Sequence, residues 1–253
     1  MITAYHRPKT LDEALTLLAQ PHTAPLGGGT LLSHPSPNRV EAVDLQAIGL
    51  NTIKKSGNNL ELGATVTLQQ LLESEHCPEA LRTALKLEAP LNLRNAATVA
   101  GTLVSCDGRS TFASVLLALD AKLELSKLEH SNVETRVSNI GEILPLRDLQ
   151  GWLITSISLP LNTRLAFEYV ARTPADKPIV CAALAQWNSG RTRLALGGYG
   201  KSPLLAMDGT EAEGLETAAR NAFHEAADEW GSAEYRMDVA AMLAKRCSVR
   251  FNV

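Results

Sequence analysis

The pattern of apolar and polar residues up to Pro160 mixes helical and strand periodicities. Thr10 and Glu13 predict a capping box at a helix N-terminus, and Thr67 and Gln70 predict a second one. Another helix is expected from Pro78, because the fixed φ of proline suits a first helical position. The remaining apolar segments predict a buried helical stretch at 114–119 and strands at 40–45, 59–64, 121–125 and 152–159.

After Pro160 the pattern changes to a hairpin followed by helices. Two β-rich runs, 179–187 and 192–198, are separated by the turn residues Asn188-Ser-Gly190 and predict a β-hairpin. Residues 215–226 then place leucine, alanine and phenylalanine on one helical face. Ser232 is expected to cap a last helix, whose buried side is predicted to carry Tyr235, Val239, Met242 and Leu243. We place a domain boundary near residue 161, which gives domains 1–161 and 162–253.

The composition excludes several classes of function. Lys and Arg number 24 against 27 Asp and Glu, so the net charge of −3 provides no general field for nucleic acid or anionic lipid. The start of the chain lacks a secretory signal, and the longest apolar runs are too short to span a membrane. These features predict a cytoplasmic protein that binds no nucleic acid.

The ionisable and nucleophilic residues indicate no catalytic or metal site. The four cysteines are scattered without a C-x-x-C pair, which is typical of reduced core thiols and not of a metal site. The histidines show no metal-ligand spacing, and no Ser-His-Asp or nucleophile-elbow motif occurs. We therefore predict no catalytic residue and no bound metal in this chain.

The strongest local signal is the segment Leu26-Gly-Gly-Gly-Thr-Leu31. Glycines allow positive φ and close approach of the backbone, and successive exposed N–H groups form an anion-binding nest. Thr30 adds a hydroxyl donor. A tight turn that requires positive φ is the structural alternative.

A second segment, Ala97-Thr-Val-Ala-Gly-Thr-Leu103, lies in a stretch from Asn92 that is predicted to be a loop leading to a glycine turn. Thr98, Gly101 and Thr102 again combine hydroxyls with backbone amides. Two such segments suit a pyrophosphate held from both sides. Neither is G-x-G-x-x-G, so a dinucleotide is not expected to bind in the Rossmann manner.

These residues carry a family resemblance. Three motifs occur in this order: Leu-Gly-Gly-Gly-Thr-x-Leu, Leu-Arg-Asn-x-Ala-Thr-x-x-Gly-x-Leu and Leu-Leu-Ala-Leu-Asp-Ala. The chain thereby resembles the FAD-binding medium subunit of molybdenum hydroxylases, the xanthine dehydrogenase and carbon monoxide dehydrogenase flavoprotein family. Ile157-Ser-Leu-Pro160 and Gly231-Ser-Ala-Glu-Tyr-Arg236 also match the family's patterns. The similarity runs over nearly the whole chain.

The resemblance implies an α+β fold. A two-part FAD-binding domain of the vanillyl-alcohol-oxidase (PCMH) type would be followed by a small C-terminal domain with an antiparallel sheet and helices. Carried over by position, the cofactor-binding residues are Leu26, Gly27, Gly28, Gly29, Thr30, Leu31, Thr98, Gly101, Thr102, Ile154 and Tyr169. Ile154 falls at an apolar contact to the flavin ring, and Tyr169 falls where a lysine is often found near that ring.

The implied activity is electron relay. Electrons would arrive from the [2Fe-2S] clusters of a small partner subunit and leave through FAD to NAD, oxygen or another acceptor. Substrate oxidation would take place in a molybdopterin-binding large subunit.

The sequence departs from the family pattern at three positions. Ala100, before Gly101, stands where a paired Gly-Gly is usual, Thr111 stands where an aspartate commonly contacts the cofactor, and Tyr169 stands where a lysine is often found. Two alternatives therefore stay open: an assembly subunit whose flavin site has decayed, and a stand-alone flavin reductase of the same fold. Asp107 with Arg109 offers a substitute carboxylate, although a solvated loop pair also explains them.

Overall fold

The computed structural model describes residues 1–253 except 131, 146–148, 150, 211 and 252–253. The chain forms two compact units, and each is built from segments that are not continuous in sequence. The first unit comprises Met1–Ser74, Leu91–Ser105 and Lys122–Ser158. The second unit comprises Glu75–Pro90, Cys106–Ala121 and Leu159–Val253.

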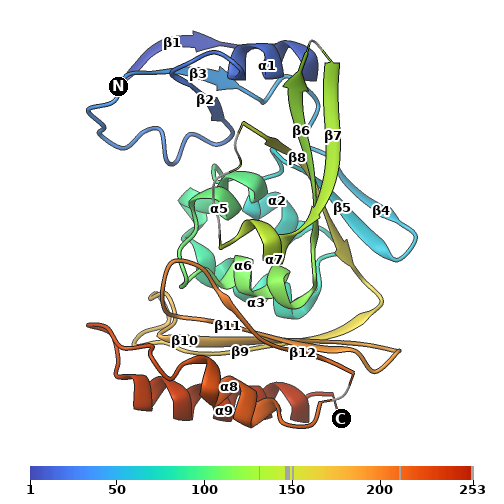
Figure 1. Cartoon of the computed structure of the whole chain (residues 1–253), viewed down its shortest axis with the longest axis vertical. Coiled ribbons are helices and arrows are strands. Elements are labelled where there is room, and N and C mark those ends of the chain that lie inside the picture. The colour runs from blue at the N-terminus through green and yellow to red at the C-terminus, as the bar shows by residue number, and fades with distance from the viewer. Residues whose placement is uncertain (131, 146–148, 150, 211, 252–253) are drawn as a thin grey trace. The chain divides into compact units, whose positions relative to one another are not determined.

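The first unit begins with a small parallel sheet whose strand order is β1-β3-β2. Helix α1 packs on this sheet, and Figure 1 shows both in blue. The core between them contains Ala14, Leu15, Val43 and Leu45. The bounds are β1 Ile2–His6, α1 Leu11–Leu18, β2 Thr23–Leu26 and β3 Val40–Asp44.

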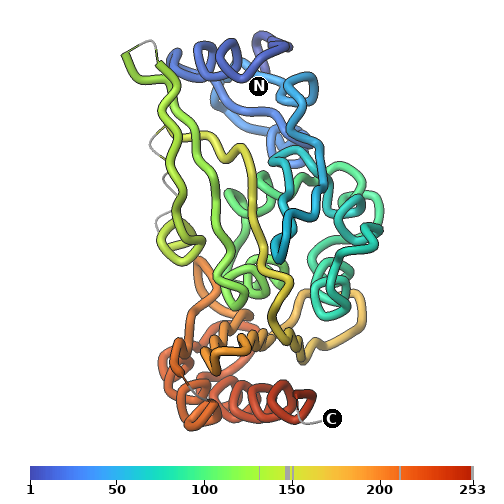
Figure 2. Tube along the Cα trace, turned by 90° about the vertical axis from the view of Figure 1, so that its right-hand side faces the viewer, coloured from blue at the N-terminus to red at the C-terminus, as the bar shows by residue number. Residues whose placement is uncertain are grey.

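A second sheet of the first unit has the strand order β4-β5-β8-β6-β7. Figure 2 shows β6 and β7 as a long hairpin with β8 beside it. The strands are β4 Ile53–Ser56, β5 Asn59–Gly63, β6 Lys122–Glu129, β7 Asn132–Asn139 and β8 Leu153–Pro160. The helices of this unit beyond α1 are α2 Leu68–Glu73, α4 Leu91–Arg94, α5 Val99–Ser105 and α7 Ile140–Ile143.

The second unit is a four-stranded antiparallel sheet, ordered β12-β11-β10-β9, between two layers of helices. Figure 1 shows α8 and α9 on one face, and α3 and α6 on the other. The strands are β9 Thr163–Val170, β10 Val180–Trp187, β11 Thr192–Gly197 and β12 Leu204–Gly209. The helices are α3 Glu79–Glu88, α6 Thr111–Ala118, α8 Leu215–Ala222 and α9 Ala233–Val249.

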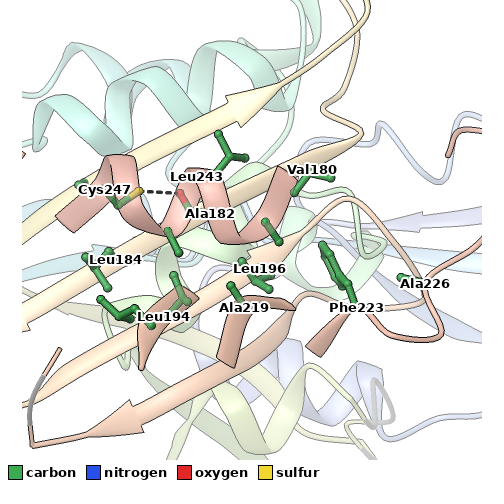
Figure 3. Packing of buried hydrophobic residues seen from close by; sticks show 14 of the residues in the cluster. Val180, Ala182, Leu184, Leu194, Leu196, Ala219, Phe223, Ala226, Leu243 and Cys247 are labelled. Atoms are coloured by element: carbon green, nitrogen blue, oxygen red, sulfur yellow. Dashed lines mark hydrogen bonds between the residues drawn. The ribbon is translucent and has the colours of Figure 1, made fainter. Parts of the chain in front are cut away.

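The core of the second unit lies between the sheet and helices α8 and α9. Figure 3 shows side chains of β10 and β11 meeting Ala219, Phe223 and Leu243. Cys247 in α9 donates from its thiol to the carbonyl oxygen of Ala182 in β10 at 3.6 Å. The cysteines of the chain are buried and free of disulfides: Cys77, Cys106, Cys181 and Cys247.

The predicted helix starts at Thr10, Thr67 and Ser232 are confirmed, whereas Pro78 is the N-cap of α3 and not its first helical residue. Thr10 accepts a hydrogen bond from the Glu13 amide, and Thr67 and Gln70 form both halves of a capping box. The Glu13 carboxylate binds the amide of Lys9 instead of Thr10, so the first box is completed one residue earlier. The structure also confirms the predicted strands as β3 (predicted 40–45), β5 (59–64), β6 (121–125) and β8 (152–159). It confirms the predicted hairpin after 179 as β10 and β11.

The prediction of a loop over 92–103 was wrong. This segment contains most of α4 and the start of α5, and the two helices are too short for their periodicity to be read from sequence. Strands β1, β7, β9 and β12 were not predicted either. Most of their residues are only partly buried or exposed, so they lack a regular alternation of apolar residues.

The predicted buried face of α9 was only partly right, because Leu243 is buried and Val239 packs against the core while the other two residues are exposed. Tyr235 and Met242 are 41% and 37% exposed, whereas Leu243 is buried beside Ala240, Ala244 and Cys247. The buried face also contains Arg236, whose side chain is fully buried. An arginine inside a core is not expected from hydrophobic periodicity, because burying an unpaired charge is costly.

Hydrogen bonds explain the burial of Arg236. Its guanidinium donates to the carbonyl oxygens of Ala226 at 2.7 Å and Gly231 at 2.8 Å, and to the Asp228 carboxylate at 2.7 Å. The side chain therefore holds the turn between α8 and α9 against α9. No helix in the described part of the chain is long and apolar enough to cross a membrane.

We expect Arg236→Met to destabilise the second unit by about 3–5 kcal/mol, because Asp228 and two carbonyls lose their donor. Arg220→Met is the matched control, since Arg220 pairs with Asp238 where both side chains are about half exposed. Its cost is expected to stay below about 1 kcal/mol. Urea unfolding of both variants measures the free energy of unfolding, and equal losses of stability in the two variants would contradict the role given to Arg236.

A buried thiol predicts a pH dependence of stability. Burial raises the pKa of Cys181 to about 12, whereas an unfolded thiol ionises near pH ~8.5. The stabilisation is therefore complete below that pH and is lost as the pH rises toward the folded pKa. Relative to Cys181→Ala, we expect the wild-type free energy of unfolding to fall by about 1.4 kcal/mol per pH unit above pH ~9. Urea titrations at several pH values give the two curves, and parallel curves would contradict the prediction.

Candidate functional site

The first unit contains a cavity of about 240 Å³. Four segments form its wall: the end of β2 with the glycine loop, the turn after β5, helix α5, and the start of β8. The lining residues are Ala24, Pro25, Leu26, Gly27, Gly28, Gly29, Thr30, Leu31, Leu32, Leu45, Ala64, Thr65, Thr98, Ala100, Gly101, Val104, Ser105, Leu149, Trp152, Leu153 and Ile154.

The glycine loop leaves the parallel sheet where β2 ends at Leu26. The carbonyl of Leu26 accepts from the Leu45 amide at 3.0 Å, and the carbonyl of Gly27 accepts from the Gln46 side chain at 2.6 Å. Gly29 then adopts a φ of 72°, and its carbonyl accepts from the Ser33 amide at 3.0 Å. These hydrogen bonds fix the orientation of the carbonyls of Leu26, Gly27 and Gly29.

The backbone amides of the glycine loop differ from its carbonyls in their hydrogen bonding. Within the described residues, the N–H groups of 27–32 have no acceptor in the chain. Consecutive free amides beside a cavity are the donors of an anion-binding nest. The amides of 27–32 are therefore available as donors beside the cavity.

The glycine loop also makes a close backbone contact with the segment before α5. A Cβ atom on Gly28 would overlap the carbonyl oxygen of Ala96, and one on Gly27 would lie 2.7 Å from the Thr98 hydroxyl oxygen. Only glycine fits at these two positions without moving the backbone or Thr98. The contact brings the two predicted segments to one wall of the cavity.

The second segment differs from the predicted glycine turn. Gly101 lies inside α5, and its amide donates to the Thr98 hydroxyl at 3.1 Å. The amide of Thr102 donates to the Thr98 carbonyl at 2.8 Å, as does the Thr102 hydroxyl. The amides of Val99 and Ala100 reach the carbonyls of Val66 and Ala64. These amides are therefore satisfied within the chain, and the segment adds shape and the Thr98 hydroxyl.

The structure brings together most of the residues that the sequence indicated. The glycine loop, Thr98, Gly101 and Ile154 line the cavity, whereas Thr102 does not. Tyr169 lies on β9 of the second unit and is 37% exposed.

Thr65 and Trp152 are among the cavity residues that the sequence analysis missed. Thr65 is almost fully buried, yet its hydroxyl has no hydrogen-bond partner in the described part of the chain. Trp152 precedes β8 and is half-buried beside Ile154. No local signal distinguishes Thr65 or Trp152, because their position depends on the contacts of the turn after β5 and of β8.

The described lining of the cavity is uncharged. Among the residues that the structure describes, none with an ionisable side chain lines it. Nor does that part of the chain contain a cluster of His, Cys, Asp or Glu that suits a metal ion. The polar groups that face the cavity are backbone amides and hydroxyls.

Comparison with known proteins decides the family. Residues 1–162 match the family described as "FAD binding domain in molybdopterin dehydrogenase". The chain belongs to this family. FAD is accordingly its cofactor, and the mixed α/β fold inferred from the resemblance is confirmed.

Relatives match over nearly the whole chain. "Uncharacterized protein YgfM" of Escherichia coli is 30% identical over 96% of this chain and 94% of its own length. The "Carbon monoxide dehydrogenase medium chain" of Afipia carboxidovorans is 25% identical over 97% of this chain and 95% of its own. A solved structure of Cu,Mo-CO dehydrogenase superposes with a TM-score of 0.82 at 25% identity, covering 99% of this chain and 97% of the other.

The residues of the cavity fit FAD. A dinucleotide carries a pyrophosphate that accepts hydrogen bonds, and the free amides of 27–32 are unused donors. The unpartnered hydroxyl of Thr65 is a second buried group that requires a polar partner, because an unsatisfied hydroxyl costs about 1–3 kcal/mol. Ala100 replaces a family glycine at the wall of the cavity, and its methyl group is accommodated there within α5.

Thr111 has a structural role inside the second unit. Its hydroxyl lies 2.7 Å from the Ala84 carbonyl and 3.2 Å from the Glu88 carboxylate. Glu88 also accepts from Ser110 and from the Phe112 amide, which stabilises the start of α6. An aspartate at 111 would place a second carboxylate beside Glu88, whereas the threonine hydroxyl forms internal hydrogen bonds.

Asp107 and Arg109 do not form a side-chain pair. The Asp107 carboxylate accepts from the Arg109 amide at 2.9 Å and lies 3.7 Å from Lys177. The Arg109 guanidinium donates to the carbonyls of Lys177 and Pro178 and lies over Trp230. Both residues thus organise loops of the second unit.

We expect Gly28→Ala to weaken FAD binding by about tenfold or more, which corresponds to ~1.4 kcal/mol. The added methyl group must push Ala96 or the glycine loop out of place, at a cost of about 1–3 kcal/mol in stability. Gly231→Ala is the matched control, since its Cβ would meet nothing closer than 3.4 Å. Equilibrium dialysis with FAD and thermal unfolding test the pair. Unchanged binding in Gly28→Ala would show that the loop is only a turn.

Proposed function

We propose that this chain is the FAD-binding electron-transfer subunit of a molybdopterin-dependent hydroxylase or dehydrogenase in the cytoplasm. Its partners are a small subunit with [2Fe-2S] clusters and a large molybdopterin-binding subunit. The proposal is supported by membership of the family and by medium-chain relatives that match over nearly their whole length. Residues 1–161 are assigned to FAD binding and 162–253 to the C-terminal domain.

The observation that carries the proposal is the chemistry of the cavity. Its donors are the free amides of 27–32 and the hydroxyls of Thr65 and Thr98, and no ionisable side chain is found among its described lining residues. These described residues can bind and orient a dinucleotide, and none of them is an acid or base for a carbon substrate. This arrangement suits a subunit that moves electrons and leaves substrate oxidation to another chain.

The predicted cofactor-binding residues are assigned separate roles. The loop Leu26–Leu31 binds the pyrophosphate through its free amides, and Thr30 adds its hydroxyl. Thr98 accepts from Gly101 and keeps its own hydroxyl proton for the cofactor, while Gly101 and Thr102 hold Thr98 in place. Ile154 contacts the flavin ring through its apolar side chain, and Tyr169 is assigned to the acceptor side.

Bound FAD supplies the chemistry of the relay, because a flavin accepts electrons singly and passes them on singly or in pairs. NAD, oxygen or another molecule is the final acceptor. The protein's contribution is to hold the cofactor and to exclude water with the apolar side chains of the cavity.

An assembly subunit with a decayed flavin site is the second candidate. The specific observation in its favour is Thr111, which is buried among Ala84 and Glu88 where the family commonly has a cofactor-binding aspartate. A stand-alone flavin reductase is less well supported, because such an enzyme needs a proton donor at its substrate pocket. The described lining of the cavity provides none.

The purified chain is expected to bind one equivalent of FAD and to show the visible absorbance of oxidised flavin. Reduction with dithionite followed by exposure to NAD or oxygen reports electron transfer to each acceptor. The native complex should co-purify with iron–sulfur and molybdenum chains, and the isolated chain should oxidise no carbon substrate.

Two outcomes would contradict the proposal. A colourless protein that takes up no added FAD would favour the assembly subunit. Oxidation or reduction of a carbon substrate by the isolated chain would favour the stand-alone reductase.

A further inference from the structure

Trp152 is an aromatic residue in a cavity that otherwise has aliphatic, glycine and hydroxyl side chains. The family resemblance assigns it no role. Its backbone is held at the start of β8, where the Trp152 amide donates to the Leu149 carbonyl at 2.8 Å. This bond positions the Trp152 backbone directly before β8, whose first two residues, Leu153 and Ile154, also line the cavity.

One face of the Trp152 ring is covered by an arginine. The guanidinium carbon of Arg136 lies 4.3 Å from the ring centroid, which is the geometry of a cation–π contact. Arg136 belongs to β7, and strands β7 and β8 flank β6 on opposite sides. In the sheet register, Arg136 and Ile154 are both partners of Leu125. Arg136 thus reaches across β6 toward the beginning of β8.

The two faces of the Trp152 indole have different surroundings. Arg136 is not among the residues that line the cavity, whereas Trp152 is. The face opposite Arg136 is thus the one available to the cavity. The same cavity is lined by Ile154 and by Thr65, whose hydroxyl has no partner in the described residues, so it offers both apolar surface and a polar atom that requires a partner.

We propose that Trp152 is a stacking platform for a flat heteroaromatic ring of the bound dinucleotide. This inference rests on the proposed function, since it concerns the same cavity and FAD. An indole face gains dispersion and π contacts from a flat ring without requiring a specific hydrogen bond. Arg136 restrains the indole from behind, so the platform is formed before the ligand binds and little side-chain entropy is lost on binding.

The chain offers a matched control for this arrangement. Trp187 also has an arginine over its ring, with Arg191 at 5.1 Å from the centroid. Trp187 ends β10 in the second unit and is not a lining residue of the cavity. Removing its indole therefore removes a similar arginine–tryptophan contact without touching the proposed site.

The experiment compares FAD dissociation constants of the full chain and three variants by equilibrium dialysis. We expect Trp152→Leu to bind FAD about 10- to 100-fold more weakly, which is the range found when a stacked aromatic residue is removed. Trp152→Phe keeps a ring and should lose less than about fivefold, whereas Trp187→Leu should stay within about twofold of wild type. Thermal unfolding of each variant reports whether it is folded.

A second readout does not depend on affinity. An indole stacked on the flavin quenches flavin fluorescence, so a longer fluorescence lifetime of bound FAD in Trp152→Leu identifies the isoalloxazine as the stacked ring. Dialysis with ADP and with FMN distinguishes the two halves of the cofactor. A loss confined to ADP assigns the stack to adenine, and a loss confined to FMN assigns it to the flavin.

The outcomes separate this inference from the proposed function. Wild-type protein that binds FAD, together with a Trp152→Leu variant that binds it equally well, overturns the platform and leaves the electron-transfer function standing. Equal losses of FAD affinity in Trp152→Phe and Trp152→Leu also overturn the stacking platform, because the loss of side-chain volume would then explain the effect without stacking. Wild-type protein that binds no FAD overturns both proposals.

Discussion

The site of the first unit depends on one close contact between two backbones. Gly28 approaches the Ala96 carbonyl so closely that a Cβ atom would overlap it, and Gly27 approaches the Thr98 hydroxyl in the same way. This contact joins the end of β2 to the start of α5 and so closes one wall of the cavity. The glycines serve two purposes at once, because the missing side chains permit the contact and also leave the following amides exposed.

Hydrogen bonding differs between the two sides of that contact. The carbonyls of the glycine loop are held by Leu45, Gln46 and Ser33, while its amides have no acceptor in the described chain. The amides at the start of α5 are satisfied by Thr98, Val66 and Ala64. The cavity thus has unused amide donors on one side and the helical wall of α5, whose amides are satisfied, on the other. A nearly neutral protein can bind a polyanionic dinucleotide in this way without an arginine cluster.

The second unit uses buried charge to hold its loops. Arg236 is fully buried and donates to two carbonyls and to Asp228, and Glu88 accepts from the residues that begin α6. Their cost of desolvation is offset by hydrogen bonds to neighbouring backbone and side chains, so they define loop geometry.

The sequence by itself determined the features that depend on near neighbours. Capping residues such as Thr67, the alternation of β6 and the apolar run of α6 need only residues a few positions away. The glycine loop was also found in this way, together with the family. Tertiary structure alone decided that Gly101 lies in a helix, that Arg236 is buried, and that Thr65 and Trp152 face the cavity. The physical reason is that a hydrogen bond or a buried surface depends on its partner, and these partners come from distant segments of the chain.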